Sequence, residues 1–211
     1  HTVSQPYVDL ITREVKGYEA LTRFDDGTRP DVLITAAWAV GVGAEVEIAC
    51  ARAALDVANQ VMPGVPISLN FSPQTILRGD VADVVTRSDE PLVIEVTEHT
   101  EISDYPALRD ALQRCGQIKV SVDDAGAGFA SMRHILELHP DVVKLDIGLI
   151  RGIDVDLGRQ ALAAGLCHYA AQTGTLLIAE GIETAEEAEM ARTLGVHYGQ
   201  GYFFGRPARV D

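Results

Sequence analysis

Short apolar segments alternate with helix-like segments along almost the whole chain, and this alternation limits the fold more than any other feature of the sequence. Most of the apolar segments are continuous runs, which is typical of parallel strands covered on both faces. They span residues 65–72, 91–98, 119–123, 141–148, 175–182 and 196–205. Helices are expected at residues 75–86, 105–115, 129–138, 157–173 and 183–194. This order predicts a parallel sheet whose strands are joined by crossover helices.

The N-terminal segment has a different pattern. The stretches "VSQPYVDL" and "EVKGYEALTRF", separated by "ITR", indicate a hairpin, so one early strand is expected to run antiparallel. Two hairpin strands and six further strand units favour a closed barrel over an open sheet. We therefore predict an α/β fold, a modified TIM-type (β/α) barrel with one antiparallel strand near the N-terminus. With 211 residues it would be shorter than the roughly 250 residues typical of such barrels.

Charge and composition narrow the choice of partners. The formal net charge of −14 would repel a phosphate backbone, so no nucleic-acid polymer is expected as a partner. Three widely separated cysteines argue against a disulfide framework and against a zinc site. Apolar runs stay well below the roughly 20 residues that span a membrane, so no membrane contact is expected from this segment.

The chain has no linker-like stretch, which predicts a single domain over residues 3–207. Because His1 is not a natural start, we expect this domain to be a piece of a longer protein. A cytoplasmic location is expected, with any membrane anchor lying outside this segment.

Charged and amide side chains recur at or near the ends of the expected strands. In a parallel barrel the carboxyl ends of the strands meet at one face, where active sites lie. The side chains are Glu19, Asn70, Glu95, Asp123, Asp124, Lys144, Asp146, Glu180 and Gln200. We therefore expect five carboxylates to converge there with the Asn70 amide: Glu19, Glu95, Asp123, Asp124 and Glu180.

Such a convergence would need positive charge. Five carboxylates in one concavity cannot all stay ionised without positive partners. A set of oxygen ligands without Cys or His suits Mg²⁺ or Mn²⁺, and this many carboxylates can hold two ions. Lys144 would add a fixed cation. The combination fits metal-assisted displacement at phosphorus and would allow an acidic protein to bind an anionic phosphodiester.

Taken singly, these residues have simpler explanations. A strand-end aspartate such as Asp123 or Asp124 is often a helix N-cap, and a lone asparagine such as Asn70 often forms a turn. Trp38 is expected to belong to the core rather than to a ligand site. The residues alone leave the choice between capping and metal binding open.

Seven segments, in order, resemble the EAL domain family. They are "YEALTRF", "NFSP", "IEVTE", "DDAGAG", "VKLD", "AEGIET" and "GQGYFFGRP", and the resemblance extends over residues 5–207. Members of this family are phosphodiesterases that linearise the bacterial messenger cyclic di-GMP, and some members only bind it. The tripeptide that names the family is Glu19-Ala20-Leu21.

The resemblance implies a role for each matching position. Two ions, Mg²⁺ or Mn²⁺, would be held by Glu19, Asn70, Glu95, Asp123 and Asp124, with Asp124 bridging toward the second ion. This favours the metal-binding interpretation of Asp123 and Asp124. The glycines at 126 and 128 would let the following loop bend. In the family this loop links metal occupancy to dimerisation, so a homodimer is expected.

The remaining matches concern the substrate and the reaction. Lys144 would hold or polarise the attacking water, and Glu180 would be the general base or act mainly as a ligand. Arg23 would grip the substrate phosphate, a task suited to a planar guanidinium. Gln200 would contact the site from the last strand. Glu98 and Glu183 would support the site.

The chain departs from the family at two places. Ala125 and Ala127 stand where the family has an aromatic residue and a threonine. The stretch "TAAWAVG" lacks the acidic residue that often contacts the guanine, a task that Trp38 could take over.

We expect an enzyme that hydrolyses cyclic di-GMP to the linear dinucleotide pGpG. The alternative is a silent receptor for cyclic di-GMP, which the full set of site residues disfavours. A scaffold without ligand is disfavoured because buried carboxylates would be destabilising without a metal ion.

Overall fold

The computed structural model describes residues 1–61, 64–88, 91–97, 102–125 and 129–209. In this part of the chain eight strands are hydrogen-bonded in sequence order as a closed barrel, so the predicted α/β barrel fold is confirmed. The strands are β1 (Thr2–Asp9), β2 (Val15–Thr22), β3 (Ile67–Phe71), β4 (Leu92–Val96), β5 (Ile118–Ala125), β6 (Val142–Leu145), β7 (Leu176–Ala179) and β8 (Tyr198–Gln200).

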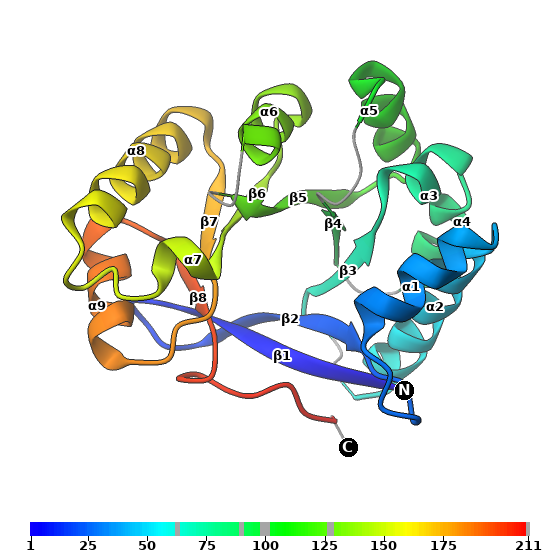
Figure 1. The fold of residues 1–211 in the computed structure, drawn as a ribbon, viewed down its shortest axis with the longest axis horizontal. Coiled ribbons are helices and arrows are strands. Elements are labelled where there is room, and N and C mark those ends of the chain that lie inside the picture. The colour runs from blue at the N-terminus through cyan, green and yellow to red at the C-terminus, as the bar shows by residue number, and fades with distance from the viewer. Residues whose placement is uncertain (62–63, 89–90, 98–101, 126–128, 210–211) are drawn as a thin grey trace. The chain divides into compact units, whose positions relative to one another are not determined.

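The helices of the described residues are connected to these strands in the expected alternation (Figure 1). They are α1 (Pro30–Ala39), α2 (Gly43–Val61), α3 (Pro73–Arg78), α4 (Val81–Val85), α5 (Tyr105–Arg114), α6 (Phe129–Leu138), α7 (Ile147–Ile150), α8 (Leu157–Thr173) and α9 (Ala185–Leu194). Among them, no helix has both the length and the apolar character needed to cross a membrane.

The antiparallel strand is β1. It pairs with β8, with Tyr7 opposite Gln200, whereas β2 with β3, β3 with β4, and the consecutive pairs from β5 to β8 are parallel. The turn after β1 is closed by Asp9, whose N–H donates to the Glu14 carbonyl and whose carboxylate accepts from two turn N–H groups. The prediction of one early antiparallel strand is therefore confirmed.

The chain divides into two compact units. Unit 1 comprises His1–Ser4, Tyr18–Ile118 and Pro207–Asp211, and unit 2 comprises Gln5–Gly17 and Lys119–Arg206. In unit 1, α2 packs against β3, and in unit 2, α8 packs against α9 and β7 (Figure 1).

The core of unit 1 follows from helical periodicity. In α2 the fully buried apolar residues are spaced three or four apart, which places them on one face of the helix. They are Ala44, Ile48, Ala51, Leu55 and Ala58, and Ala54 beside Leu55 is buried with them. Because most of them are small, the helix lies close to the buried strand β3.

The core of unit 2 contains an aromatic pair. Tyr7 is buried with Val142 and Ile178, and its ring centroid lies 6.0 Å from that of Tyr198. A Cβ atom at Gly17 would lie 2.1 Å from the Tyr7 hydroxyl oxygen, so only glycine leaves room for this ring.

Three expected elements differ from those observed. The helix expected at residues 75–86 is two helices, because α3 ends at Gly79 in the left-handed conformation that glycine adopts readily. The strand expected at 141–148 ends at Leu145, since the Asp146 carboxylate accepts from the Gly148 N–H and caps α7. The strand expected at 196–205 is reduced to β8 and is followed by turns.

Candidate metal-binding site

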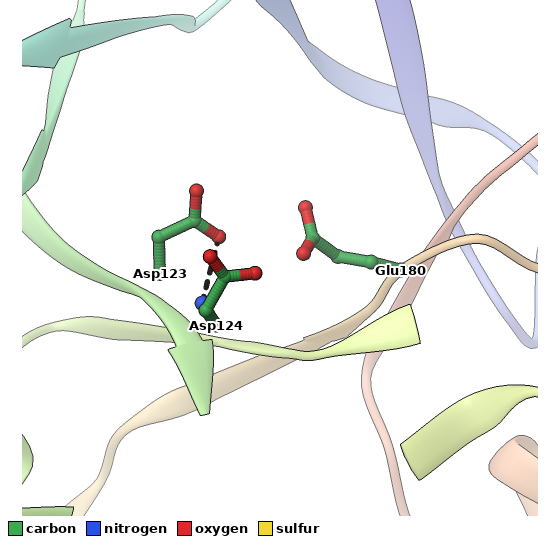
Figure 2. A group of neighbouring side chains, drawn as sticks. All are labelled: Asp123, Asp124 and Glu180. Atoms are coloured by element: carbon green, nitrogen blue, oxygen red, sulfur yellow. Dashed lines mark hydrogen bonds between the residues drawn. The ribbon is translucent and has the colours of Figure 1, made fainter. Parts of the chain in front are cut away.

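Three carboxylates gather in unit 2, at the carboxyl ends of β5 and β7. Asp123 and Asp124 come from the end of β5, and Glu180 directly follows β7. Each offers an oxygen atom, and these oxygens all lie within 4.8 Å of one another. Figure 2 shows the three side chains facing a common space. A set of clustered, half-buried oxygen donors is suited to a hard divalent cation.

A local irregularity lets both aspartates contribute to this cluster. Adjacent side chains in a regular strand point to opposite faces. The pairing of β5 with β6 shifts register between Val122 and Ala125, and Asp124 has a φ of 55°, in the left-handed region. The Asp124 N–H donates to Asp123 Oδ1 over 2.9 Å. This bulge breaks the alternation and brings two consecutive carboxylates to one place.

Lys144 supplies the cation of the cluster. Its side chain lies on β6 and is only 1% exposed. Its Nζ lies 2.7 Å from Glu180 Oε1 and 3.5 Å from Asp123 Oδ1. The ammonium group thus pairs with two of the three carboxylates, a balance that favours an additional cation.

Glu183 lies apart from this cluster and makes an ion pair with Arg151. The Arg151 guanidinium holds the pKa of Glu183 below its ordinary value. Arg151 also donates to the Gly181 carbonyl over 3.1 Å, so it fixes the segment that carries Glu180.

Residues at the start of α9 also fix the segment that carries Glu180. Thr184 and Glu187 form a capping box, and the Glu187 carboxylate accepts from the N–H groups of Glu183, Thr184 and Gly152. Burial acts to raise the pKa of Glu187, but these backbone donors lower it below its ordinary value. Glu187 and Arg151 were not expected as supporting residues. The T-x-x-E spacing of a capping box was the signal that could have revealed Glu187.

Gln200 lies on β8 and is buried. Its Nε2 lies 3.4 Å from Gln5 Oε1, and the Gln5 amide donates to the Gly205 carbonyl. The residue is therefore anchored to the β1 segment of unit 2.

Unit 1 holds a second group of the expected site residues. The Asn70 amide on β3 donates to Glu19 Oε1 on β2 over 3.0 Å. Asn70 is also the register partner of Glu95 on β4, so their side chains lie on the same face of the sheet. Glu19 and Glu95 are both buried. These three oxygen-bearing residues come together as expected.

Arg23 follows the end of β2 and lines a cavity of about 200 Å³ together with Asn70. One guanidinium nitrogen donates to the Thr22 carbonyl over 2.8 Å. The proposed phosphate ligand and a proposed metal ligand thus border the same space.

The structure forms two groups of expected site residues, one in each unit. That both groups together hold the metal ions stays a prediction. Glu98 and the loop positions 126–128 lie outside the described residues. Asp123 and Asp124 lie within β5, which extends to Ala125, and the residues between β5 and α6 lie outside the described part of the chain, so the N-cap alternative stays a prediction.

Comparison with known families adds to this geometry. The family model described as "EAL domain" matches residues 1–207. The chain belongs to the EAL domain family.

Two relatives that match this chain in sequence carry the name cyclic di-GMP phosphodiesterase. The EAL chain is 29% identical over 216 residues to the cyclic di-GMP phosphodiesterase TpdA of Vibrio parahaemolyticus, covering 97% of this chain and 36% of TpdA. It is 28% identical over 155 residues to the cyclic di-GMP phosphodiesterase PdeF of Escherichia coli, covering 69% of this chain and 21% of PdeF. The chain therefore spans well under half the length of these curated relatives.

Solved structures share the fold. The calcium/cyclic di-GMP and manganese/cyclic di-GMP complexes of Klebsiella pneumoniae BlrP1 each match with a TM-score of 0.88 and 26% identity, over 98% of this chain and 55% of BlrP1. The cyclic di-GMP complex of the PaMucR phosphodiesterase matches with a TM-score of 0.86 and 25% identity, over 98% of this chain and 96% of that one.

A buried glutamate near the site was not expected from the sequence of this EAL domain. Glu47 on α2 accepts hydrogen bonds from the Trp38 indole N–H over 3.0 Å and from the Ser72 N–H over 2.9 Å. The Ser72 hydroxyl also donates to it over 3.0 Å, and Ser72 caps α3 two residues after Asn70. An acidic residue among the buried positions of an amphipathic helix was the available signal.

Trp38 is half-buried and lines a cavity of about 440 Å³ in unit 1. The expectation that it belongs to the core is therefore wrong. Its indole is fixed at the cavity wall by Glu47 instead of being enclosed by apolar side chains.

Proposed function

We propose that this EAL domain is a metal-dependent phosphodiesterase that hydrolyses one phosphodiester bond of cyclic di-GMP to give pGpG. The observation that carries the proposal is the cluster of Asp123, Asp124 and Glu180 around the buried Lys144. The donors are all carboxylate oxygens, as Mg²⁺ and Mn²⁺ prefer. The manganese and calcium complexes of the related BlrP1 support a divalent cation in this family.

The metal-binding residues would be Glu19, Asn70, Glu95, Asp123 and Asp124, and they would hold two ions, Mg²⁺ or Mn²⁺. Bound divalent ions at such a site lower the pKa of a bound water and offset the charge of the phosphate. The bulge at Asp124 supports this assignment, because it presents two adjacent carboxylates to one space.

Side chains of this chain would accept the proton of the attacking water and bind the substrate. Glu180 would accept the proton of the attacking water, and Lys144, 2.7 Å from it, would hold this carboxylate in place. Arg23 would bind a phosphate oxygen of the substrate from the cavity beside Asn70. Gln200 would contact the substrate from β8. Glu98 and Glu183 would support the site, Glu183 through its ion pair with Arg151.

A cytoplasmic location and a homodimer complete the proposal. The cytoplasm is where a bacterial second messenger would be available to this domain. The homodimer stays a prediction from the resemblance alone.

A receptor that binds cyclic di-GMP without turnover is the competing function. The ion-paired Lys144 and Glu180 argue against it, because binding alone does not require a carboxylate positioned to accept a proton.

The test is incubation of the purified chain with cyclic di-GMP and Mg²⁺ or Mn²⁺, with the linear product followed by chromatography. Glu180→Gln should abolish product formation, while Glu186→Gln on the exposed side of α9 should not. Tight binding in Ca²⁺ with no product from the wild type would support the receptor instead. Neither binding nor turnover would overturn both functions.

A further inference from the structure

The cavity that Arg23 lines in unit 1 is apolar over most of its wall. It has a volume of about 200 Å³ and is bordered by the end of β2, by α1, by α2 and by β3. The apolar residues of the wall are Ala20, Leu21, Ile34, Ala51, Ala54 and Leu69. Because three of them are alanines, their side chains are too short to fill the space between these helices and strands.

The volume of the cavity limits the size of a ligand. Sites for drug-sized molecules begin at roughly 300 Å³, which is larger than this cavity. An apolar protein cavity of roughly 150 Å³ already binds benzene. The space therefore favours a single aromatic ring or a short alkyl chain over a whole nucleotide.

Arg23 contributes a positive charge to the same wall. Its guanidinium carries five N–H groups, and one of its nitrogens donates to the Thr22 carbonyl over 2.8 Å. Among the described residues no carboxylate makes an ion pair with it. The guanidinium therefore has donors left for an anion, and a planar carboxylate matches their geometry.

Glu47 is the negatively charged residue on this wall. Its carboxylate already accepts from the Trp38 indole N–H and from the N–H and hydroxyl groups of Ser72. These donors offset its charge, so a ligand need not bring a cation to it. Arg23 is thus the group that selects the charge of a ligand.

We propose that this cavity binds a small organic carboxylate with an apolar body, an aromatic acid or a short-chain fatty acid, whose carboxylate pairs with Arg23. The ring or alkyl chain would lie against Ala51, Ala54 and Leu69, where its burial is favourable. The consequence for catalysis rests on the proposed function. Because Arg23 is the proposed phosphate ligand, the bound carboxylate competes with cyclic di-GMP and slows its turnover.

Cys50 reports on the occupancy of the cavity, because its half-buried side chain lines the wall. The purified chain is alkylated with iodoacetamide, and mass spectrometry of the peptides gives the rate at each cysteine. Benzoate and hexanoate, at ten times the dissociation constants measured by calorimetry, should slow alkylation of Cys50 by about tenfold. Cys167 is also half-buried but lies on α8 in unit 2, so its rate should not change. Acetate, which lacks the apolar body, and benzyl alcohol, which lacks the charge, should give little protection at the same concentrations.

Two variants separate the charged part of the site from its apolar part. Arg23→Gln should weaken benzoate binding by about tenfold or more, whereas Arg87→Gln at an exposed position should bind like the wild type. Ala51→Leu fills the cavity and should abolish benzoate binding, whereas Ala53→Leu on the exposed side of the same helix should not. Thermal melts verify that each variant is folded. If Ala51→Leu does not fold, Arg23→Gln and the acetate and benzyl alcohol comparisons still decide.

The outcomes separate this site from the proposed function. Failure of both benzoate and hexanoate to bind or to protect Cys50, or equal benzoate affinity in Arg23→Gln and the wild type, would overturn the site. Protection together with inhibition that additional cyclic di-GMP relieves supports the site and the competition for Arg23. Protection without any inhibition, in a chain that hydrolyses cyclic di-GMP, would overturn the competition. A chain that binds benzoate but neither binds nor hydrolyses cyclic di-GMP would retain the site and overturn only the proposed function.

Discussion

Lys144 Nζ lies 2.7 Å from Glu180 Oε1, on a side chain that is almost fully enclosed. The same ammonium lies 3.5 Å from Asp123 Oδ1, so one buried cation orients a carboxylate of β5 and the carboxylate that directly follows β7. An arrangement of this kind acts through fixed charge and fixed geometry, which are the main sources of electrostatic stabilisation in enzymes.

Lys144→Met should therefore reduce turnover of cyclic di-GMP by about 100-fold, because the fixed charge that orients Glu180 is lost. The measurement is kcat for pGpG formation at saturating substrate and metal. Lys119→Met, on the exposed side of β5, is the matched control and should retain the wild-type rate. Equal rates for the two variants would show that the ion pair has no part in the reaction.

Asp124→Asn should weaken Mn²⁺ binding by at least tenfold, because it removes one negative charge from the carboxylate cluster. Asparagine tolerates the left-handed backbone of this position, so the change isolates the charge from the fold. Calorimetric titration with Mn²⁺ measures the loss, and Asp110→Asn on the exposed side of α5 should bind as the wild type does. Unchanged affinity in Asp124→Asn would remove this residue from the proposed ligands.

Glu47→Ala should lower the free energy of unfolding by about 2–3 kcal/mol, because it leaves the half-buried Trp38 donor and the buried Ser72 donors without their acceptor. Urea unfolding gives the value. Two residues earlier on the same helix, Glu45 makes an exposed salt bridge with Arg78, so Glu45→Ala should cost less than about 1 kcal/mol. A similar loss of unfolding free energy in both variants would show that the hydrogen bonds of Glu47 to Trp38 and Ser72 do not stabilise the fold.

Stability should fall as the pH drops below about 6.5, in part because of His134. Burial lowers the pKa of this histidine in the folded chain, with a smaller contribution from Arg133. The unfolded chain consequently takes up the proton first, so the contribution of His134 to stability is complete above the unfolded pKa and declines as the pH falls toward the folded pKa. Urea unfolding between pH 7.5 and about 5, above the range in which ordinary carboxylates titrate, would measure the slope. In His134→Phe the slope should be smaller, and an identical slope would refute this origin.

Sequence patterns predicted which segments form helices and strands better than they predicted the residues at which these elements end. The apolar runs around Leu69, Ile94 and Val143 are buried strands, as expected. The ends shifted where a single side chain changed the local hydrogen bonding. Asp146 stops β6 by capping α7, and Gly79 divides one expected helix into two. Whether an aspartate extends a strand or caps a helix depends on the N–H groups that follow it in space, so periodicity alone does not decide it.

The sequence by itself determined the alternating barrel fold, the family and the types of side chain at the strand ends, because apolar periodicity and motif order are local properties of the chain. Only the tertiary structure decided that Asp124 adopts a left-handed bulge beside Asp123, that Lys144 lies against Glu180, and that Trp38 lines a cavity. Each of these depends on the register between strands or on a contact between distant segments, such as that of Glu47 with Ser72. A pattern of residue types constrains register and distant contacts only weakly, whereas packing selects one arrangement of them.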